Sequence, residues 1–373
     1  TYEAGEDGCV DLGQQVPLSG SYDWVDPMGL LWTLKPRKEK RLPLGSNPFS
    51  TKPVVIHFTA EQGEATASTT IERAWLREGV QRIPVNEDGL HGVLFMPPGE
   101  GPFPGIMILT GSGGGANERT AALLANHGYA ALGLAYFAYP GRPKFLLEIE
   151  LEYFEKGFEW LAAKPEVDGG KLAVTGGSRG GELSLLLGSI FPQIKTVVAY
   201  VPSGYRWGGF SDEGSPLVPA WTYKGEGLPF VLHEEQGDWE TKYGPDESIP
   251  LTPEFLTAVE KAESLEEATI KVENTNGAIL LISGDEDAMW PSAIFSRQVM
   301  QRLEEKGFGH PYKHLEYACA GHGILMPYIP LAPADIVHPV DGGLYALGGT
   351  PQPMAHAIED SWQGMLVFLE ENL

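Results

Sequence analysis

Ser178, in the pattern Gly176-x-Ser178-x-Gly180, has the sequence context best suited to nucleophilic chemistry in this chain. The apolar run KLAVTG (171–176) precedes it and ELSLLL (182–187) follows, so the serine falls at a predicted strand-to-helix turn. A serine hydroxyl is a poor nucleophile unless a tight turn exposes it, and flanking glycines let neighbouring backbone pass closely. The amide of Arg179, which opens the helix, is expected to face a developing oxyanion.

Such a serine needs a histidine to accept its proton and an acid to orient that histidine, and in chains with this turn the acid precedes the histidine. The predicted strand AILLISG (278–284) is followed by two candidate acids. Asp287 is preferred and Asp285 is the alternative, because the turn usually spans two residues after the glycine. A later strand, Tyr312–Tyr317, leads into a loop with His322 between two glycines, which makes His322 the candidate base.

A glycine-rich loop, ILTGSGGGANERT (108–120), follows another apolar run. Gly111, Gly113 and Ala116 loosely match a dinucleotide fingerprint, but no acidic residue follows at the end of the next strand. We therefore expect no cofactor, and interpret the backbone at Ser112 and Gly113 as the second half of an oxyanion hole. No metal site is expected either, since Pro311 separates His310 from His314 and makes a helical ligand pair improbable.

These residues need a sheet to bring them together, and short apolar runs alternating with amphipathic segments predict one. Runs of this kind are typical of a mostly parallel sheet covered by helices on both faces. Expected strands are 105–109, 129–137, 171–176, 196–201 and 278–284. Expected helices cover the apolar stripe from Leu147 to Leu161, the segment from Ser292 to Gly307, and the stretch from about His356 to the end.

The chain divides by composition into two expected domains. Residues 1–78 carry β-prone stretches between turns and are predicted to form a small β-rich domain. Residues 79–373 are predicted to form the α/β catalytic domain. Within it, about 205–275 lacks clear periodicity and is interpreted as a lid-like insertion over the substrate pocket.

Charge and hydropathy exclude several classes of partner. With 50 acidic and 26 basic residues the net charge is -24, which disfavours nucleic acid and anionic membranes. No apolar run approaches the roughly 20 residues of a membrane span, and no signal peptide is evident. A cytoplasmic protein with a small-molecule substrate is expected, although the chain starts at Thr1 and an upstream segment could have been removed.

Several segments together resemble the acyl-CoA thioesterases that are grouped with bile acid-CoA:amino acid N-acyltransferases. They include DPMGLLWTLKP (26–36), GPFPGIMILTGSGGG (101–115), SRGGELSLLLGSIF (178–191) and GDEDAMWPS (284–292). The resemblance implies an α/β-hydrolase fold similar to dienelactone hydrolases, preceded by a β-sandwich that this chain would enter partway. It also implies a triad at Ser178, Asp287 and His322.

The resemblance implies hydrolysis of acyl-CoA thioesters to free acid and CoA through an acyl-enzyme. A carboxylesterase or lactone hydrolase, and an acyl-CoA:amine N-acyltransferase, remain alternatives. Acyltransferase members look to carry cysteine at the turn, so Ser178 favours hydrolysis. Cys319 is interpreted as a buried small hydrophobe rather than a nucleophile. The 232–269 segment matches the family poorly, which leaves acyl specificity open.

Overall fold

The computed structural model describes residues 1–34, 50–232, 243–244, 246–324, 327 and 335–373. At its centre is an eight-stranded sheet in the order β13-β12-β9-β8-β5-β6-β4-β3. The neighbouring pairs from β13 to β6 are parallel, and β4 and β3 add an antiparallel edge. The strands are β3 (Gln81–Glu87), β4 (Leu90–Met96), β5 (Phe103–Leu109), β6 (Ala130–Leu134), β8 (Val167–Gly177), β9 (Ile194–Tyr200), β12 (Ala278–Gly284) and β13 (Tyr312–Tyr317).

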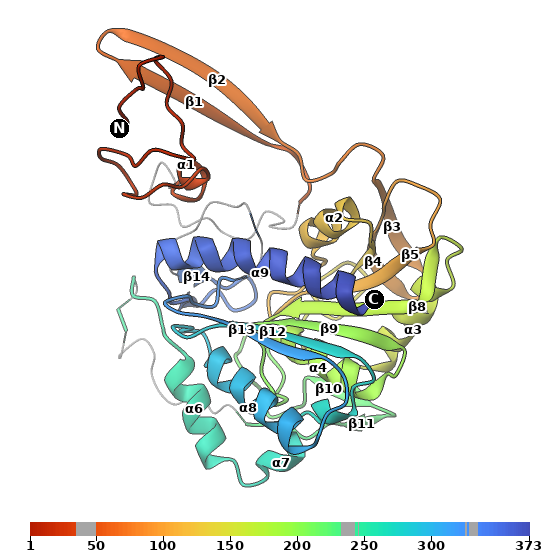
Figure 1. Ribbon diagram of the computed structural model, residues 1–373. Coiled ribbons are helices and arrows are strands. Elements are labelled where there is room, and N and C mark those ends of the chain that lie inside the picture. The colour runs from red at the N-terminus through yellow and green to blue at the C-terminus, as the bar shows by residue number, and fades with distance from the viewer. Residues whose placement is uncertain (35–49, 233–242, 245, 325–326, 328–334) are drawn as a thin grey trace.

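Helices cover both faces of this sheet (Figure 1). One face packs against α3 (Glu152–Ala162), α4 (Arg179–Ile190) and α8 (Ser292–Glu305). The other packs against α2 (Glu118–Asn126) and α9 (Pro351–Asn372). Every residue of β6 and β12 is buried, as a strand covered on both faces requires. The expectation of a mostly parallel sheet between two helical layers is confirmed.

Two helix boundaries differ from the expectation. The apolar stripe predicted a helix from Leu147, but α3 begins at Glu152 because Ile149–Glu150 form a short strand, β7, parallel to β10 (Trp221–Tyr223). A strand of two residues leaves no periodicity in the sequence. The last helix begins at Pro351 instead of His356, with proline in its first turn, where a missing amide costs nothing.

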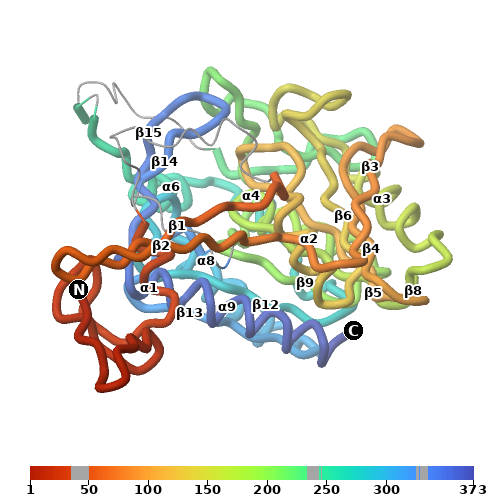
Figure 2. Tube along the Cα trace, turned by 90° about the horizontal axis from the view of Figure 1, so that it is seen from above, coloured from red at the N-terminus to blue at the C-terminus, as the bar shows by residue number. Residues whose placement is uncertain are grey.

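The expected insertion holds small elements that its composition did not predict. These are β10, β11 (Glu226–Gly227), α6 (Thr252–Lys261), α7 (Leu265–Ala268) and the 3-10 helix η1 (Val272–Asn274). Two further strands, β14 (Asp335–Val337) and β15 (Leu344–Ala346), pair as an antiparallel hairpin, drawn in blue in Figure 2. Ile249 joins the two regions, since its amide donates to Leu344 and its carbonyl accepts from Ala346. This contact brings the chain after β13 onto the insertion.

The N-terminal region contains a long hairpin that extends away from the sheet (Figure 1). Its strands, β1 (Val54–Gln62) and β2 (Ala65–Arg73), pair in register, and most of their side chains are exposed. A short helix, α1 (Gly29–Trp32), precedes them. None of the helices in the described ranges is long and apolar enough to cross a membrane.

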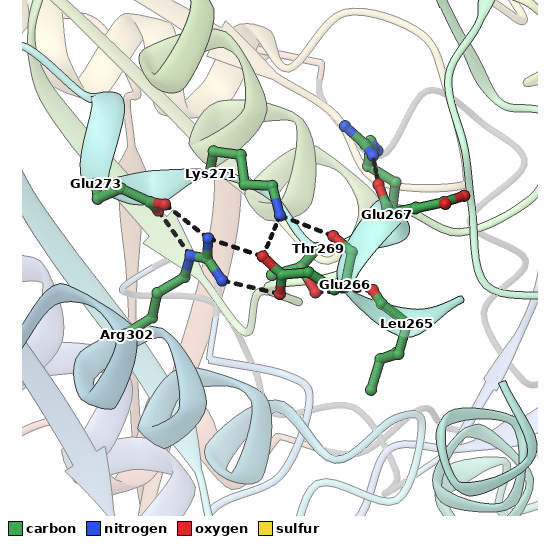
Figure 3. Close-up of polar contacts among 8 residues, drawn as sticks. Leu265, Glu266, Glu267, Thr269, Lys271, Glu273 and Arg302 are labelled. Carbon is green, nitrogen blue, oxygen red and sulfur yellow. Dashed lines mark hydrogen bonds and ion pairs between the residues drawn. The ribbon is translucent and has the colours of Figure 1, made fainter. Parts of the chain in front are cut away.

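An ion-pair cluster fastens the end of the insertion to α8 (Figure 3). Arg302 of α8 donates to Glu273 of η1 at 2.7 and 2.6 Å, and to Glu266 of α7 at 3.1 and 3.2 Å. Lys271 also donates to the Glu266 carboxylate. Hydrogen bonds from Lys271 and then Arg302 lower the pKa of Glu266 from 4.5 to about 2. The cluster therefore needs Glu266 ionised.

We predict that Arg302→Met destabilises the fold more than Arg297→Met, the matched control. The Arg302 side chain is only 16% exposed and binds two carboxylates, whereas the Arg297 side chain is 53% exposed and, within the described residues, pairs with one, that of Glu316. Hydrogen bonds to charged groups contribute about 1.5–3 kcal/mol, and surface pairs about 0–1 kcal/mol. Thermal unfolding should show a midpoint lower by roughly 2–6 °C for Arg302→Met.

The same comparison has a defined pH dependence. Since folding depresses the pKa of Glu266, its contribution is complete above about pH 4.5 and is lost as the pH falls toward 2. The gap in midpoint between wild type and Arg302→Met should therefore narrow in acid. Equal effects of the two substitutions at pH 7, or a gap that widens in acid, would contradict this role for Arg302.

Candidate active site

Ser178 occupies a strained turn between β8 and α4. Its φ of 59° and ψ of −125° lie in a region that residues with a side chain rarely adopt. Backbone hydrogen bonds hold it there: its amide donates to Tyr200 at 3.0 Å, and its carbonyl accepts from Gly181 at 2.8 Å and Glu182 at 3.0 Å. A residue held in such a conformation at the end of a parallel strand is typical of an exposed nucleophile.

The two glycines of the serine motif are required by close backbone packing. A Cβ at Gly176 would lie 2.5 Å from the Gly180 carbonyl oxygen, and one at Gly180 would lie 2.4 Å from the Thr110 carbonyl oxygen. Both separations are far shorter than real contacts. The glycines thus let α4 begin directly over β8 and beside the end of β5, where the glycine-rich loop starts.

Asp287 and His322 are joined in a buried pair. The Asp287 Oδ2 lies 2.8 Å from the His322 Nδ1, and the two residues are 6% and 5% exposed. The same carboxylate accepts the Ser292 hydroxyl at 2.6 Å and the amides of Met289 and Trp290 at 3.0 and 3.2 Å. A carboxylate at Nδ1 favours a proton on that nitrogen and leaves Nε2 as a proton acceptor.

Asp285, the alternative acid, lies in a different contact. Its Oδ1 accepts the amide of Cys319 at 2.7 Å, so it orders the start of the histidine loop. The interpretation of Cys319 as a buried hydrophobe is wrong, because its side chain is exposed in a left-handed turn. The neighbouring Glu286 raises the pKa of the Cys319 thiol, which disfavours the nucleophilic thiolate.

The His322 loop is packed against the chain just before α9. The His322 amide donates to Leu347 at 2.7 Å, and a Cβ at Gly321 would lie within 2.4 Å of the Leu347 carbonyl oxygen. Trp290 lies against the imidazole, with 6.1 Å between ring centroids, and its Nε1 donates to Val201 at 2.9 Å. Val201 adjoins Tyr200, which holds the Ser178 amide.

The three predicted residues therefore follow the carboxyl ends of β8, β12 and β13, at one edge of the sheet. Within the described residues, no hydrogen bond joins the Ser178 hydroxyl to His322. The glycine-rich loop borders the serine, since a Cβ at Gly111 would lie 3.7 Å from Ser178 Oγ. Among the described parts of the chain, no residue accepts a hydrogen bond from the amides of Ser112, Gly113 or Arg179.

The Arg179 side chain makes structural contacts that do not involve its backbone amide. It is buried, donates to the carbonyls of Trp207 and Gly208 at 3.0 Å each, and pairs with Glu182 at 3.1 Å. Glu182 is fully buried and also accepts the Trp207 amide at 3.2 Å and the Trp221 indole at 2.8 Å. Burial raises the pKa of Glu182, and these donors oppose that shift. The first turn of α4 thereby anchors the insertion.

His338 contacts the glycine-rich loop, which the sequence did not indicate. Its Nε2 lies 2.9 Å from the Ser112 hydroxyl and its Nδ1 lies 3.3 Å from Asp341 Oδ1. It lies in the turn between β14 and β15, a segment without periodicity or glycine flanking, so no pattern distinguished it from the other histidines. In the residues that the structure describes, no group of three or more histidine, cysteine or acidic side chains could hold a metal ion.

Comparison with known proteins shows which family the chain belongs to. The model of the BAAT/acyl-CoA thioester hydrolase C-terminal region matches residues 149–373, and that of the acyl-CoA thioester hydrolase/BAAT N-terminal region matches 1–87. Acyl-coenzyme A thioesterase 1 from Mus musculus is 34% identical over the whole chain and 85% of its own length. The mitochondrial acyl-coenzyme A thioesterase 2 from Homo sapiens is 33% identical over the whole chain and 74% of its length.

Among solved structures, a putative dienelactone hydrolase from Klebsiella pneumoniae is similar at a TM-score of 0.44 and 16% identity, over 78% of this chain and 98% of that one. A similarity this distant adds no evidence about the fold beyond the strand order described above. A mostly parallel sheet with a strained serine turn after β8 is the α/β-hydrolase fold. With this fold, two family models and relatives about a third identical over the whole chain, the chain belongs to the acyl-CoA thioester hydrolase/BAAT family.

Proposed function

We propose that the protein hydrolyses acyl-CoA thioesters to a free acid and CoA, with Ser178 as nucleophile, His322 as base and Asp287 as the orienting acid. The substrate class comes from the names of its relatives. The observation that carries the mechanism is the buried Asp287–His322 pair at 2.8 Å, at the same sheet edge as the strained Ser178 turn.

In the first half-reaction Ser178 Oγ attacks the thioester carbonyl while His322 Nε2 takes the hydroxyl proton. The oxyanion is expected to accept hydrogen bonds from the Arg179 amide and from the amide of Ser112 or Gly113. The C–S bond then breaks, and His322 returns its proton to the departing thiolate of CoA. Asp287 stays ionised throughout and stabilises the imidazolium.

In the second half-reaction water attacks the serine ester. His322 takes a proton from this water and then protonates Ser178 Oγ as the ester bond breaks and the acid leaves. The hydrogen bond between the Ser178 hydroxyl and His322 is expected to form once substrate orders the site, since catalytic hydrogen bonds are often long when no substrate is bound.

The net charge of -24 does not exclude a polyanionic substrate. At physiological salt, charges farther than about 8 Å from the ligand are largely screened, so only residues close to the pocket mouth count. The cytoplasmic localisation expected from the sequence stays a prediction, as the relatives include proteins named mitochondrial.

Ser178→Ala should lower kcat for acyl-CoA by several orders of magnitude, because the triad acts as a unit. Ser189→Ala is the matched control: it removes a half-buried hydroxyl from α4, the helix that Ser178 precedes, where this hydroxyl donates to the Leu186 carbonyl. A thiol-release assay across acyl-CoA lengths measures both. Unchanged turnover in Ser178→Ala would remove this serine from the mechanism.

The same assay separates hydrolysis from its rivals. Aryl and alkyl esters, and glycine or taurine as acceptors, are added in parallel with CoA thioesters. We expect thiol release with free acid as the product. Turnover of simple esters with no release from any CoA thioester would favour a carboxylesterase or lactone hydrolase, and conjugates in place of free acid would favour an N-acyltransferase.

Asp287→Asn should lower kcat far more than Asp285→Asn. The amide cannot hold the Nδ1–H tautomer of His322, and in a serine protease the equivalent change costs about 10⁴-fold. Asp285 binds the Cys319 amide, so its loss should cost less than about tenfold. If Asp285→Asn proved the more damaging substitution, the assignment of the acid would be wrong.

A further inference from the structure

We propose that His338 is a positioning residue for the oxyanion loop, and that it acts through the chain of contacts Asp341–His338–Ser112. This inference rests on the proposed function, because the loop from Gly111 to Gly115 matters to catalysis only if its amides bind an oxyanion. It adds a residue that lies outside the Ser178–His322–Asp287 set.

The loop has one polar side chain that other residues can bind. Four of the five residues from Gly111 to Gly115 are glycine, and Ser112 alone carries a polar side chain. Glycine backbone loses the most conformational freedom when it is ordered, so such a loop holds a fixed shape only if other groups fix it. The Ser112 hydroxyl is fixed by the His338 Nε2 at 2.9 Å, from a segment far along the chain.

The loop is also held by packing. A Cβ at Gly113 would lie 3.1 Å from the Pro339 ring, so the residue after His338 lies against the glycine whose amide is a candidate oxyanion donor. At the end of the loop, Gly115 donates its amide to Phe137 at 3.0 Å. The loop is thus held both by the His338–Pro339 pair and by the chain after β6.

His338 is itself rigidly mounted. It is 7% exposed, its amide donates to Gly343 at 2.8 Å, and its carbonyl accepts from Gly342 at 2.9 Å. The ring of Phe210, from the insertion, meets the imidazole edge to face at 5.0 Å. The imidazole therefore lies between the oxyanion loop and the insertion, with little freedom to rotate.

Asp341 sets the orientation of that imidazole. Its Oδ1 lies 3.3 Å from His338 Nδ1 and 3.0 Å from the Gly343 amide, and its Oδ2 accepts the Tyr345 hydroxyl at 2.6 Å. Burial acts to raise the pKa of Asp341, but hydrogen bonds from His338, Tyr345 and Gly343 outweigh it and hold the pKa below its usual range.

An ionised Asp341 favours a proton on His338 Nδ1, although the Val340 amide also points to this nitrogen at 3.3 Å. Both contacts are 3.3 Å long, and at equal distance a charged acceptor outweighs a neutral donor. Nε2 is then the acceptor for the Ser112 hydroxyl. This directs the hydroxyl proton toward His338, fixes the Ser112 side chain, and leaves the backbone amides of the loop as the donors to the oxyanion.

The test compares His338→Ala, His338→Gln and Ser112→Ala with His314→Ala. His314 is the matched control, because its imidazole also binds a serine, Ser283 at 2.7 Å, but on β13 away from the loop. Glutamine can keep the hydrogen bond to Ser112. We expect His338→Ala to lower kcat for acyl-CoA about 10- to 100-fold, with KM nearly unchanged. This loss is smaller than the roughly 10²- to 10³-fold that removal of an oxyanion donor costs, because His338 only positions the donors.

His338→Gln should recover most of that loss. The double variant His338→Ala/Ser112→Ala should have a kcat no lower than that of the slower single variant, because both substitutions remove the same hydrogen bond. Exchange of the hydrogen-bonded amides of Gly114 and Gly115 should rise in His338→Ala and stay at the wild-type level in His314→Ala. A kcat for His338→Ala within twofold of that for His314→Ala, or additive losses in the double variant, would overturn the inference.

A second readout separates this inference from the proposed function. Labelling of Ser178 by a fluorophosphonate forms a phosphonyl oxygen in the oxyanion position and requires no CoA. If the wild type released no CoA but was labelled, the thioesterase proposal would fail, and the ratio of labelling rates between His338→Ala and His314→Ala would still decide the role of His338. A ratio near one would overturn it.

Discussion

The strained backbone at Ser178 is the constraint on which the rest of the site depends. A residue with a side chain adopts a φ of 59° only if its surroundings hold it there, and here the hydrogen bond to Tyr200 and the missing side chains at Gly176 and Gly180 do so. The same packing brings the end of β5 against the start of α4. The glycine-rich loop therefore meets the serine because the turn is tight.

The insertion is coupled to this turn through a buried charge pair. Arg179 follows the serine directly, and its guanidinium binds the backbone of Trp207 and Gly208 while Glu182 binds two tryptophans of the same region. Removing either partner would leave the other charge buried and unpaired, which is costly. The insertion and the nucleophile turn are thus expected to respond together to changes in this pair.

The sequence predicted the parallel sheet well, because buried strands such as β12 read as unbroken apolar runs. It also singled out Asp287 and His322, which the structure joins by a hydrogen bond, although their catalytic roles remain proposals. It missed β7, because two residues carry no period, and it missed α6, none of whose residues is buried. His338 could not be singled out from the sequence, because its contact with Ser112, 226 residues earlier in the chain, forms only in the folded protein.

The central claim is that Ser178 carries the acyl group between the two half-reactions. The most direct test is rapid quenching of the protein after mixing with a slowly hydrolysed acyl-CoA, followed by peptide mass spectrometry. The account predicts a burst of CoA equal to the enzyme concentration and an acyl adduct on the peptide that contains Ser178. Steady turnover with the adduct on another residue, such as Cys319, or with no adduct and no burst, would contradict it.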